Sequence, residues 1–509
     1  MIMTTHLLSW LVFWPLLAGL LVFGLSERRA RHWALVASLA ELMLATVMIA
    51  DFQPTPEWQY EERWSWLVPL GLTVHLAVDG ISAYLVLGVA ILGPLAILAS
   101  WRRDVGKAFF YWLLAFEGGM IGALCSLDLL VFYVFWEIML LPAFFLTGIW
   151  GGEHRIRATV KFAIMTLVGS LTMLLAILYV GVRIHAATGA WSFDLGQALA
   201  LSYTADEEML LFWAFMAAFA VKIPLFPLHI WLPGAYTEAP TGAVLLMSGM
   251  MAKLGAYGMV RFAIPLFPHA GVGSAEFLAF LAVVGIVYGA IIALGQPDAK
   301  RLVAYSSFSH LGWITLGLLS FDMEGLTGSV YQMLAHAVGT GALFLIVGML
   351  WDRAGSTAIE KFGGWAATAP YLATCLLIVA LGSIGLPGLA GFVGEFMILL
   401  GAWGAWPWTA IVGGTGVVLG AGYMLLLVQR TLFGPAPGAP VSDLSWREAL
   451  IILPLVGLTI GMGVYPGPVL ERIAPSARNF LNLVEARRDT GSGAIPAGGG
   501  VSRPARITR

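Results

Sequence analysis

The chain is a succession of apolar stretches separated by short polar connections. A helix that spans a bilayer needs about 20 mostly apolar residues, and about fourteen stretches of this kind fit the sequence. The predicted spans cover residues 7–25, 33–50, 72–100, 108–125, 128–149, 158–182, 209–232, 241–264, 275–295, 302–320, 326–351, 368–402, 406–432 and 448–466. The pattern therefore predicts an all-α polytopic membrane protein.

Two of these spans contain residues that break helices. The seventh holds Pro224, Pro227 and Pro233, and the twelfth reads LGSIGLPGLAGFVGEF, with Pro387 among several glycines. Proline lacks the backbone N–H and clashes with the preceding turn, so both helices are predicted to be broken. Broken helices at corresponding places in two halves of a transporter indicate its ion or substrate site.

The spans also divide into two units. Spans four to eight and nine to thirteen are of matching size, and their odd helix number places the second unit upside down relative to the first. The predicted segments are N-terminal spans in 1–107, a first inverted repeat in 108–264, a second in 275–432, a C-terminal helix with its flank in 448–486 and a disordered Gly-, Ser- and Arg-rich tail in 487–509.

Composition agrees with a membrane protein, because 59% of residues are hydrophobic and only 11% are charged. The net charge of −2 gives no basis for binding nucleic acid. Loops after odd-numbered spans carry basic sequences such as SERRARH, WRRDVGK and GQPDAKR, whereas those after even-numbered spans are acidic, as in DFQPTPEWQYEE. Positive loops stay in the cytoplasm, which predicts both termini on the other side of the membrane. The first span lacks a cleavage site and is expected to be retained.

Nothing in the sequence indicates a redox cofactor. Cys125 and Cys375 lie in separate apolar stretches without a C-x-x-C spacing, and neither a G-x-G-x-x-G after a strand nor a Walker loop is found. We therefore expect no bound cofactor, no metal site and no nucleotide in this chain.

Ionisable residues within the spans carry the functional signal. Burying a charge at the bilayer centre costs roughly 3 kcal/mol on insertion scales, so such residues usually mark ion or proton paths. Counting about 1.5 Å per residue places most of seven such residues near the middle of the membrane: Glu117, Glu137, Lys222, Lys253, His310, His336 and Glu395. Glu117 is nearer a span end, so an interfacial acid is an alternative for it.

Each of these residues also has a purely structural interpretation. Lys222 can be satisfied by carbonyls, Glu137 can belong to a packing ion pair with Lys222, and buried histidines often only hydrogen-bond. Several ionisable groups on consecutive spans favour function. Burial disfavours a charged lysine and a nearby carboxylate favours it, so movement of Glu137 relative to Lys222 is predicted to switch the lysine between binding and releasing a proton. His310 and His336 are predicted to bridge the halves through water.

Several long segments resemble the antiporter-like membrane subunits of respiratory complex I. They are FYVFWEIMLLPAFFLTGIWGG, RATVKFAIMTLVGS, KIPLFPLHIWLPGAYTEAPTGAVLLMSGMMAKLGAYGMVRF, QPDAKRLVAYSSFSHLGW, QMLAHAVGTGALF and GLPGLAGFVGEFMILLGAW. The resemblance implies that Glu137, Lys222, Lys253 and Glu395 form a proton path. Supporting candidates are Glu117, His310, His336, His229 and Glu238.

The resemblance further implies a proton-translocating subunit of an NADH:quinone oxidoreductase in a bacterial inner membrane. NADH, FMN, iron–sulfur clusters and quinone are then expected in partner subunits. Other antiporter-like subunits of the membrane arm and lipid are the expected neighbours.

One loop departs from the family's usual pattern. After the seventh span the family reads P-D-A-H-T-E-A-P, whereas this chain reads PGAYTEAP, with Gly234 and Tyr236 in place of an acid and a histidine. This loop is predicted to be cytoplasmic, so the departure concerns the groups that take up protons on that side. It leaves Glu238 and Lys222 unchanged.

Other assemblies built on related folds stay open as alternatives. They are a multisubunit cation/proton antiporter, a membrane-bound hydrogenase, an inorganic-carbon uptake module and a structural scaffold. Carboxylates can bind sodium, but two central lysines favour protons because an ammonium repels a bound cation.

Overall fold

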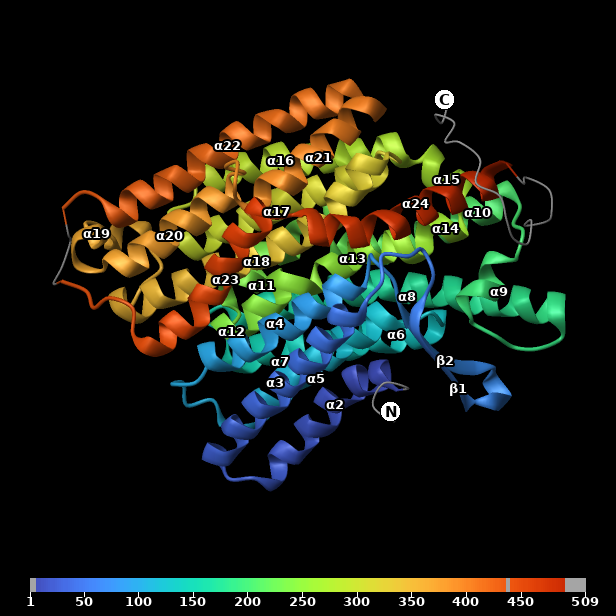
Figure 1. The fold of residues 1–509 in the computed structure, drawn as a ribbon, viewed down its shortest axis with the longest axis horizontal. Helices are drawn as coiled ribbons and strands as arrows, with labels where there is room; N and C mark the ends of the chain where they lie inside the picture. The colour runs from blue at the N-terminus through green and yellow to red at the C-terminus, as the bar shows by residue number, and fades with distance from the viewer. Residues whose placement is uncertain (1–5, 436–439, 490–509) are drawn as a thin grey trace.

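The computed structural model describes residues 6–435 and 440–489 and is built almost entirely of helices (Figure 1). Its N-terminal part consists of α2 (Leu7–Leu21), α3 (Glu27–Asp51), β1 (Gln59–Leu67), β2 (Leu72–Val78) and α4 (Ala83–Ala99). Its last two helices are α23 (Trp446–Val464) and α24 (Gly467–Asp489).

Two groups of helices lie between these segments. The first comprises α5 (Gly106–Cys125), α6 (Leu129–Ile138), α7 (Leu140–Trp150), α8 (Arg155–Thr188), α9 (Leu195–Leu199), α10 (Ala205–Lys222), α11 (Leu232–Glu238), α12 (Thr241–Leu246), α13 (Lys253–Gly258), α14 (Ile264–Leu266) and α15 (Pro268–Gly273). The second comprises α16 (Ala275–Leu294), α17 (Ala299–Leu319), α18 (Met323–Ala354), α19 (Trp365–Thr368), α20 (Pro370–Ser383), α21 (Ala390–Ala405) and α22 (Pro407–Leu432).

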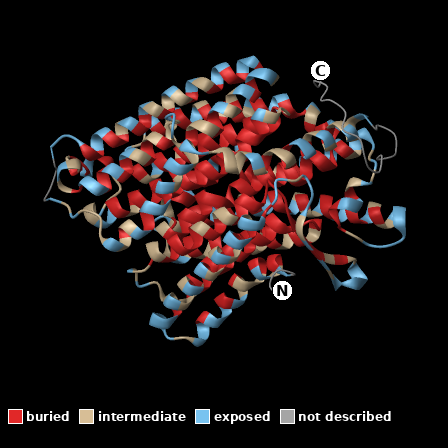
Figure 2. Ribbon diagram, in the orientation of Figure 1, coloured by how far each residue is buried: buried red, intermediate tan, exposed pale blue. Residues whose placement is uncertain are grey.

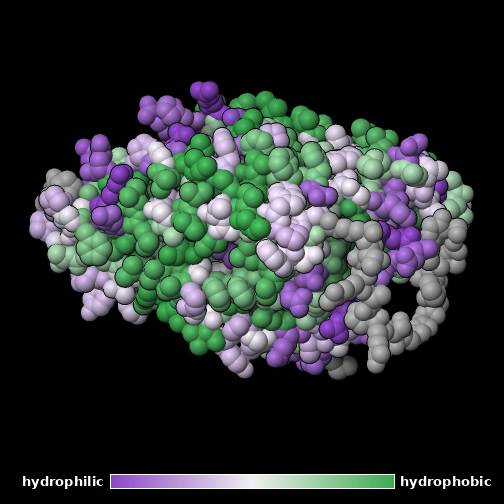
Figure 3. Space-filling model, turned by 90° about the horizontal axis from the view of Figure 1, so that it is seen from above, coloured by the Kyte–Doolittle hydropathy of each residue, from purple (hydrophilic) through white to green (hydrophobic). Residues whose placement is uncertain are grey.

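The molecule has the dimensions and surface of a multi-pass membrane protein. Within the described ranges, 11 helices are long and apolar enough to cross a bilayer, and α4, α20 and α21 are shorter apolar helices. Figure 3 shows hydrophobic side chains over the middle of the face in view and hydrophilic ones toward its two ends. The number of fourteen spans and the inverted repeats stay predictions.

The start of the third predicted span, 72–100, was wrong. Leu72–Val78 forms β2, which pairs antiparallel with β1, and the helix begins only at Ala83. Thr73 and His75 alternate with apolar residues, which is a strand period of two. Gly71, at φ +69°, makes the turn between the strands.

The connections between helices gather at two opposite ends of the bundle. At one end, called the basic-loop end, Arg31 donates to the Trp101 carbonyl at 3.2 Å and Arg447 donates to the Leu98 carbonyl at 2.9 Å. The other end, called the hairpin end, holds β1, β2 and α9 (Figure 1). The Leu127 N–H donates there to the His75 carbonyl at 2.8 Å. Loops from distant parts of the chain therefore form two shared surfaces.

Both predicted helix breaks are confirmed. Helix α10 ends at Lys222, and α11 begins at Leu232 after a short 3₁₀ turn. Helix α20 ends at Ser383 and α21 begins at Ala390. The breaks place backbone ends and ionisable side chains inside the bundle.

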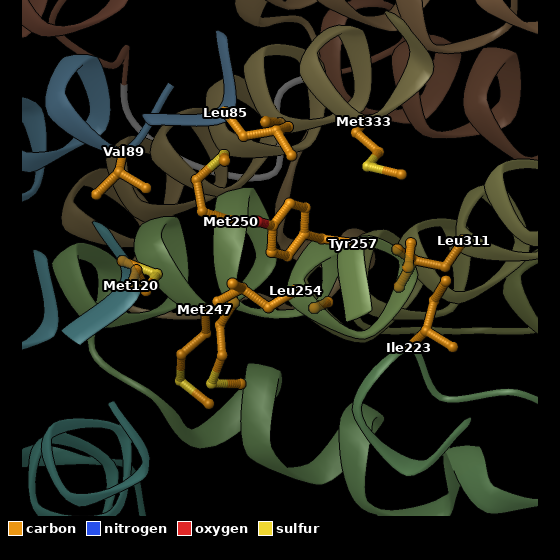
Figure 4. Close-up of a cluster of buried hydrophobic side chains, with 14 of the residues drawn as sticks. Leu85, Val89, Met120, Ile223, Met247, Met250, Leu254, Tyr257, Leu311 and Met333 are labelled. Atoms are coloured by element: carbon orange, nitrogen blue, oxygen red, sulfur yellow. The ribbon is translucent and has the colours of Figure 1, made fainter. Parts of the chain in front are cut away.

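The span Thr241–Leu266 lies at the centre of the molecule and is buried along its length. It alternates α-helix with π-helical turns at Met247–Met251 and Met259–Ala263. Figure 2 shows buried residues concentrated in the middle of the bundle. Figure 4 shows Leu254 and Tyr257 of this span among Leu85, Met120 and Leu311, which come from three other helices. π-helical turns frequently occur at functional sites.

The C-terminal helix α24 packs across the hairpin end. The Gly80 N–H donates to Ser476 Oγ at 2.9 Å, and the Tyr84 hydroxyl donates to the Pro468 carbonyl at 3.3 Å. Helix α24 continues to Asp489, so the first residues of the predicted tail, 487–489, are helical. The rest of that tail, 490–509, lies outside the described residues.

Candidate functional site

Lys222 is the last residue of α10, and its side chain is buried in the bundle. Its Nζ lies 4.6 Å from the centre of the Trp136 ring, and it has no hydrogen-bond partner among the described residues. A cation over an indole face is stabilised by about 2 kcal/mol when it is desolvated. Trp136 is therefore the group that holds the Lys222 ammonium.

Glu137 follows Trp136 on α6 and is half-buried. The ion pair with Lys222 that the sequence left open does not form within the described part of the chain, because no Glu137 oxygen lies within 4.0 Å of the Lys222 nitrogen. One carboxylate oxygen of Glu137 is buried without a hydrogen-bond partner there. The contact that the structure gives the lysine is with Trp136.

The break after α10 has a local cause. Pro224 and Pro227 cannot donate the next helical hydrogen bonds, so the carbonyls before them need other partners. Trp231 supplies one, since its indole N–H donates to the Val221 carbonyl at 2.8 Å. The break thus fixes Lys222 at a helix end in the interior.

Lys253 lies just after the first π-helical turn of the central span. Its Nζ donates to the Ser248 carbonyl of that turn. The next turn approaches α10 closely, because a Cβ on Gly255 would lie 2.7 Å from the Phe219 carbonyl oxygen and 2.8 Å from the Ile223 nitrogen. Glycine at this position brings the helix of Lys253 against the end of α10.

In the second group of helices, Glu395 accepts hydrogen bonds from two helices. His310 Nδ1 of α17 lies 2.7 Å from Glu395 Oε1, and Gln332 Nε2 of α18 lies 3.1 Å from the same oxygen. Ser383, at the end of α20, lies 3.4 Å from His310 Nε2. These contacts link the second broken helix to α17 and α18.

His336 stands between this network and Lys253. Its ring centre lies 5.6 Å from that of His310, and its helix α18 packs against the π-helical turn that precedes Lys253. Both of its ring nitrogens are buried without a hydrogen-bond partner among the described residues. An imidazole accepts a proton at one nitrogen and releases it from the other, so His336 can relay protons between Lys253 and His310.

Glu117 lies away from this series, toward the N-terminal helices. It is fully buried and accepts hydrogen bonds from Ser38 Oγ of α3 at 2.9 and 3.1 Å. Glu41, one turn further along α3, is also buried, and neither of its oxygens has a hydrogen-bond partner in the described ranges. Glu117 therefore belongs to a second acidic group at the side of the bundle.

His229 lies in the 3₁₀ turn after the first break. Its ring stacks on Phe308 of α17 at 4.3 Å, so it packs between the two groups of helices.

Glu238 lies at the basic-loop end. It accepts a hydrogen bond from the His154 N–H at 2.9 Å, at the start of α8. Tyr236, which replaces a histidine of the family pattern, is buried, and its hydroxyl donates to the Met247 carbonyl at 3.2 Å. It thus ties the loop to the first π-helical turn.

The structure adds Trp136, Gln332 and Ser383 to the predicted set. Gln332 lies four residues before His336 in an apolar span, so the two share one face of the helix. This spacing is the sequence signal that could have identified Gln332. Trp136 offered no such signal, because an aromatic residue in an apolar helix is most often packing.

The arrangement brings five predicted residues into one buried series, in the order Lys222, Lys253, His336, His310 and Glu395. Ionisable side chains inside a polytopic bundle with two broken helices define an antiporter-like membrane protein that moves ions. Residues 126–420 match the family described as NADH:quinone oxidoreductase/Mrp antiporter, TM. The chain belongs to this family.

The relatives agree over nearly the whole length. NADH-quinone oxidoreductase subunit M of Pseudomonas aeruginosa is 37% identical, with 96% of this chain and 100% of the relative covered. Among solved structures, a chain of respiratory complex I from Thermus thermophilus with bound NADH is 35% identical, with a TM-score of 0.87 and coverage of 94% of this chain and 99% of that chain. A chain of the Mrp complex from Dietzia sp. DQ12-45-1b shares the fold at 22% identity, with a TM-score of 0.82 and coverage of 95% and 100%.

Proposed function

We propose that this chain is the M subunit of a respiratory NADH:quinone oxidoreductase and carries protons across the membrane. The sequence relatives named subunit M support the choice of complex. The observation that carries the proposal is the hydrogen bond between His310 and Glu395 at 2.7 Å, since it extends the buried series across both broken helices.

The proposed path begins at Lys222 and ends at Glu395. Lys222 binds a proton under the influence of Glu137 and Trp136. The proton passes to Lys253, and His336 and His310 relay it to Glu395. Movement of Glu137 changes the stability of the Lys222 ammonium and thereby sets when the proton moves on.

Proton uptake is assigned to the basic-loop end. A cavity of about 320 Å³ opens there between the two groups of helices, and its lining includes Glu238, Thr241 and Lys300. Lys300 donates to the Ala239 carbonyl at 2.6 Å. Thr241 begins the span that carries Lys253.

Electron transfer is proposed to take place in partner subunits that hold NADH, FMN, iron–sulfur clusters and quinone. Two cysteines cannot supply the four thiolates of an iron–sulfur cluster, and both are buried on different helices. The proposed location is a bacterial inner membrane. The basic-loop end then faces the cytoplasm and the hairpin end faces the opposite side.

The test uses membrane vesicles that contain the whole complex with Lys222→Met or Glu137→Gln. NADH-driven quinone reduction and proton uptake are measured together, and assembly is checked on native gels. Both activities are expected to fall at least about ten-fold, because raising the rate-limiting barrier by about 1.4 kcal/mol has that effect.

The matched controls are Lys361→Met and Glu360→Gln, which change exposed residues near the basic-loop end. Both controls should pump normally. Normal pumping by an assembled Lys222→Met complex would contradict the proposal. Dependence of transport on sodium, with no link to quinone reduction, would instead favour the cation/proton antiporter.

A further inference from the structure

A buried ion pair lies between Lys253 and the hairpin end. Arg261, in the second π-helical turn of the central span, donates from Nη2 to Asp79 Oδ1 at 2.6 Å. The two side chains are only 9% and 7% exposed. The same Asp79 oxygen accepts the N–H groups of Ile81 and Ser82, both at 3.1 Å, so the carboxylate is fixed before α4.

Two aromatic rings enclose the guanidinium. Its central carbon lies 4.5 Å from the centre of the Trp58 ring and 5.3 Å from that of the Tyr257 ring. Trp58 is partly exposed, at 37%, whereas Tyr257 is fully buried. Helix α24 secures the neighbouring loop, because a Cβ on Gly80 would lie 2.0 Å from the Arg472 carbonyl oxygen. The ion pair is therefore held under a covered surface.

Tyr257 connects the ion pair toward Lys253. Lys253, Tyr257 and Arg261 are spaced four residues apart, so the lysine and the arginine are separated by about 12 Å along the span at 1.5 Å per residue. The Nε of Arg261 donates to the Tyr257 hydroxyl at 3.2 Å, and this hydroxyl donates to the Leu124 carbonyl at 2.9 Å. These three residues lie on successive turns of the central span between Lys253 and the hairpin end, and we call the way along them the direct route.

This route cannot conduct protons as it stands. A proton relay needs groups that accept a proton on one side and donate one on the other. Guanidinium has donors only and keeps its proton at any physiological pH. The Tyr257 proton is committed to the Leu124 carbonyl, which has nothing to pass on.

The second group of helices offers the contrasting arrangement. The second break holds His310, Glu395 and Ser383. An imidazole, a carboxyl group and a hydroxyl group can each accept a hydrogen bond and, when they carry a proton, donate one. A proton on Lys253 thus has a conducting route through His336 and a closed one toward Arg261.

We propose that Arg261, held by Asp79 and Tyr257 beneath Trp58, closes the direct route from Lys253 to the hairpin end, so that protons leave only through His336 and the second group of helices. This inference rests on the proposed function, because it takes Lys253 to be a proton carrier. Arg261 thus sets the direction in which a proton leaves Lys253. Its loss produces a leak, whereas loss of Lys222 stops transport.

The test measures passive proton flow in proteoliposomes that contain the whole complex, without NADH. A potassium diffusion potential drives the flow and an internal pH dye reports it. Arg261→Met should raise the passive flow on the order of ten-fold, since this change needs only about 1.4 kcal/mol off the barrier. NADH oxidation should continue, with fewer protons retained per NADH. The exposed control Arg301→Met should stay tight.

Two further variants make the result specific. Asp79→Asn combined with Arg261→Met leaves no unpaired buried charge and should leak like Arg261→Met, even if the single variant assembles poorly. Lys253→Leu added to either variant should abolish the leak, because the lysine feeds it. An assembled complex without a leak, or a leak that persists with Lys253→Leu, would overturn the inference. Normal pumping by Lys253→Leu alone would instead contradict the proposed function.

Discussion

The ammonium of Lys222 lies 4.6 Å from the centre of the Trp136 ring, so an indole and not a carboxylate contacts the lysine. Trp136 is adjacent to Glu137 in the chain, so any movement of this part of α6 changes two influences on the lysine together. The cation and the carboxylate are therefore coupled through one short segment.

Trp136→Leu should weaken proton binding at Lys222. Loss of a desolvated cation–π contact of about 2 kcal/mol corresponds to more than a ten-fold change in an equilibrium constant. NADH-driven proton uptake in vesicles should fall, while Trp136→Phe, which keeps an aromatic face, should retain more of it. Trp446→Leu is the control, because this tryptophan is 82% exposed. Equal activity of Trp136→Leu and Trp136→Phe would show that the ring face is not what holds the lysine.

Gln332→Leu should impair the end of the proton path. The change removes the hydrogen bond of 3.1 Å to Glu395 and leaves His310 as the side-chain donor to Oε1. Hydrogen bonds to charged groups contribute about 1.5–3 kcal/mol, so coupled turnover should fall roughly ten-fold. Gln429→Leu, which changes an exposed glutamine of α22, serves as the control. Unchanged turnover in both variants would place Gln332 outside the path.

Gly255→Ala should disturb the contact between α13, which carries Lys253, and α10, which carries Lys222. The added methyl group would lie 2.7 Å from the Phe219 carbonyl oxygen, so one helix must move. Overpacking of this kind costs about 1–3 kcal/mol. Thermal unfolding of the purified complex should shift down and proton uptake should fall. Gly339→Ala is the matched control, because nothing lies within 4 Å of its added Cβ. A similar loss in both variants would point to a general intolerance of these helices.

The hairpin end should show a pH-dependent stability. His75 Nδ1 of β2 lies 2.7 Å from Asp194 Oδ2 before α9. Burial lowers the pKa of His75, but the hydrogen bond and charge of Asp194 outweigh burial and raise it above its usual 6.5. Burial raises the pKa of Asp194, but His75 and Arg63 outweigh it and lower this pKa below its usual 3.8.

The sign of the effect follows from linkage. The raised pKa of His75 stabilises the fold fully below about pH 6.5, and this contribution is lost as pH rises through the raised value. The lowered pKa of Asp194 stabilises it above about pH 4, and this contribution is lost as pH falls further. The difference in melting temperature between the natural chain and Asp194→Asn should thus be largest between these limits. Asp206→Asn, at an exposed position, should show no such maximum. A constant difference across pH would refute the pairing.

The apolar periodicity was sufficient to predict most of the helices, because a segment without water must satisfy its backbone hydrogen bonds internally. Pro224 and Pro387 were sufficient to predict the two breaks, because proline lacks the N–H that a helix needs for its internal hydrogen bonds. The pattern failed at Leu72–Val78, where apolar residues form β2 instead of the start of a span. An apolar strand and the first turns of an apolar helix have similar compositions, and the pairing of β2 with β1 depends on distant residues.

The sequence by itself determined the burial of Lys222, Lys253 and Glu395, since it follows from their apolar neighbours. It did not single out Arg261 or Glu41, which the structure also buries. Only the tertiary structure decided their partners. Trp136 beside Lys222, Gln332 beside Glu395, and Asp79 beside Arg261 each join helices that are far apart in the chain. The physical reason is that hydropathy sets the depth of a side chain, whereas helix packing sets its neighbours.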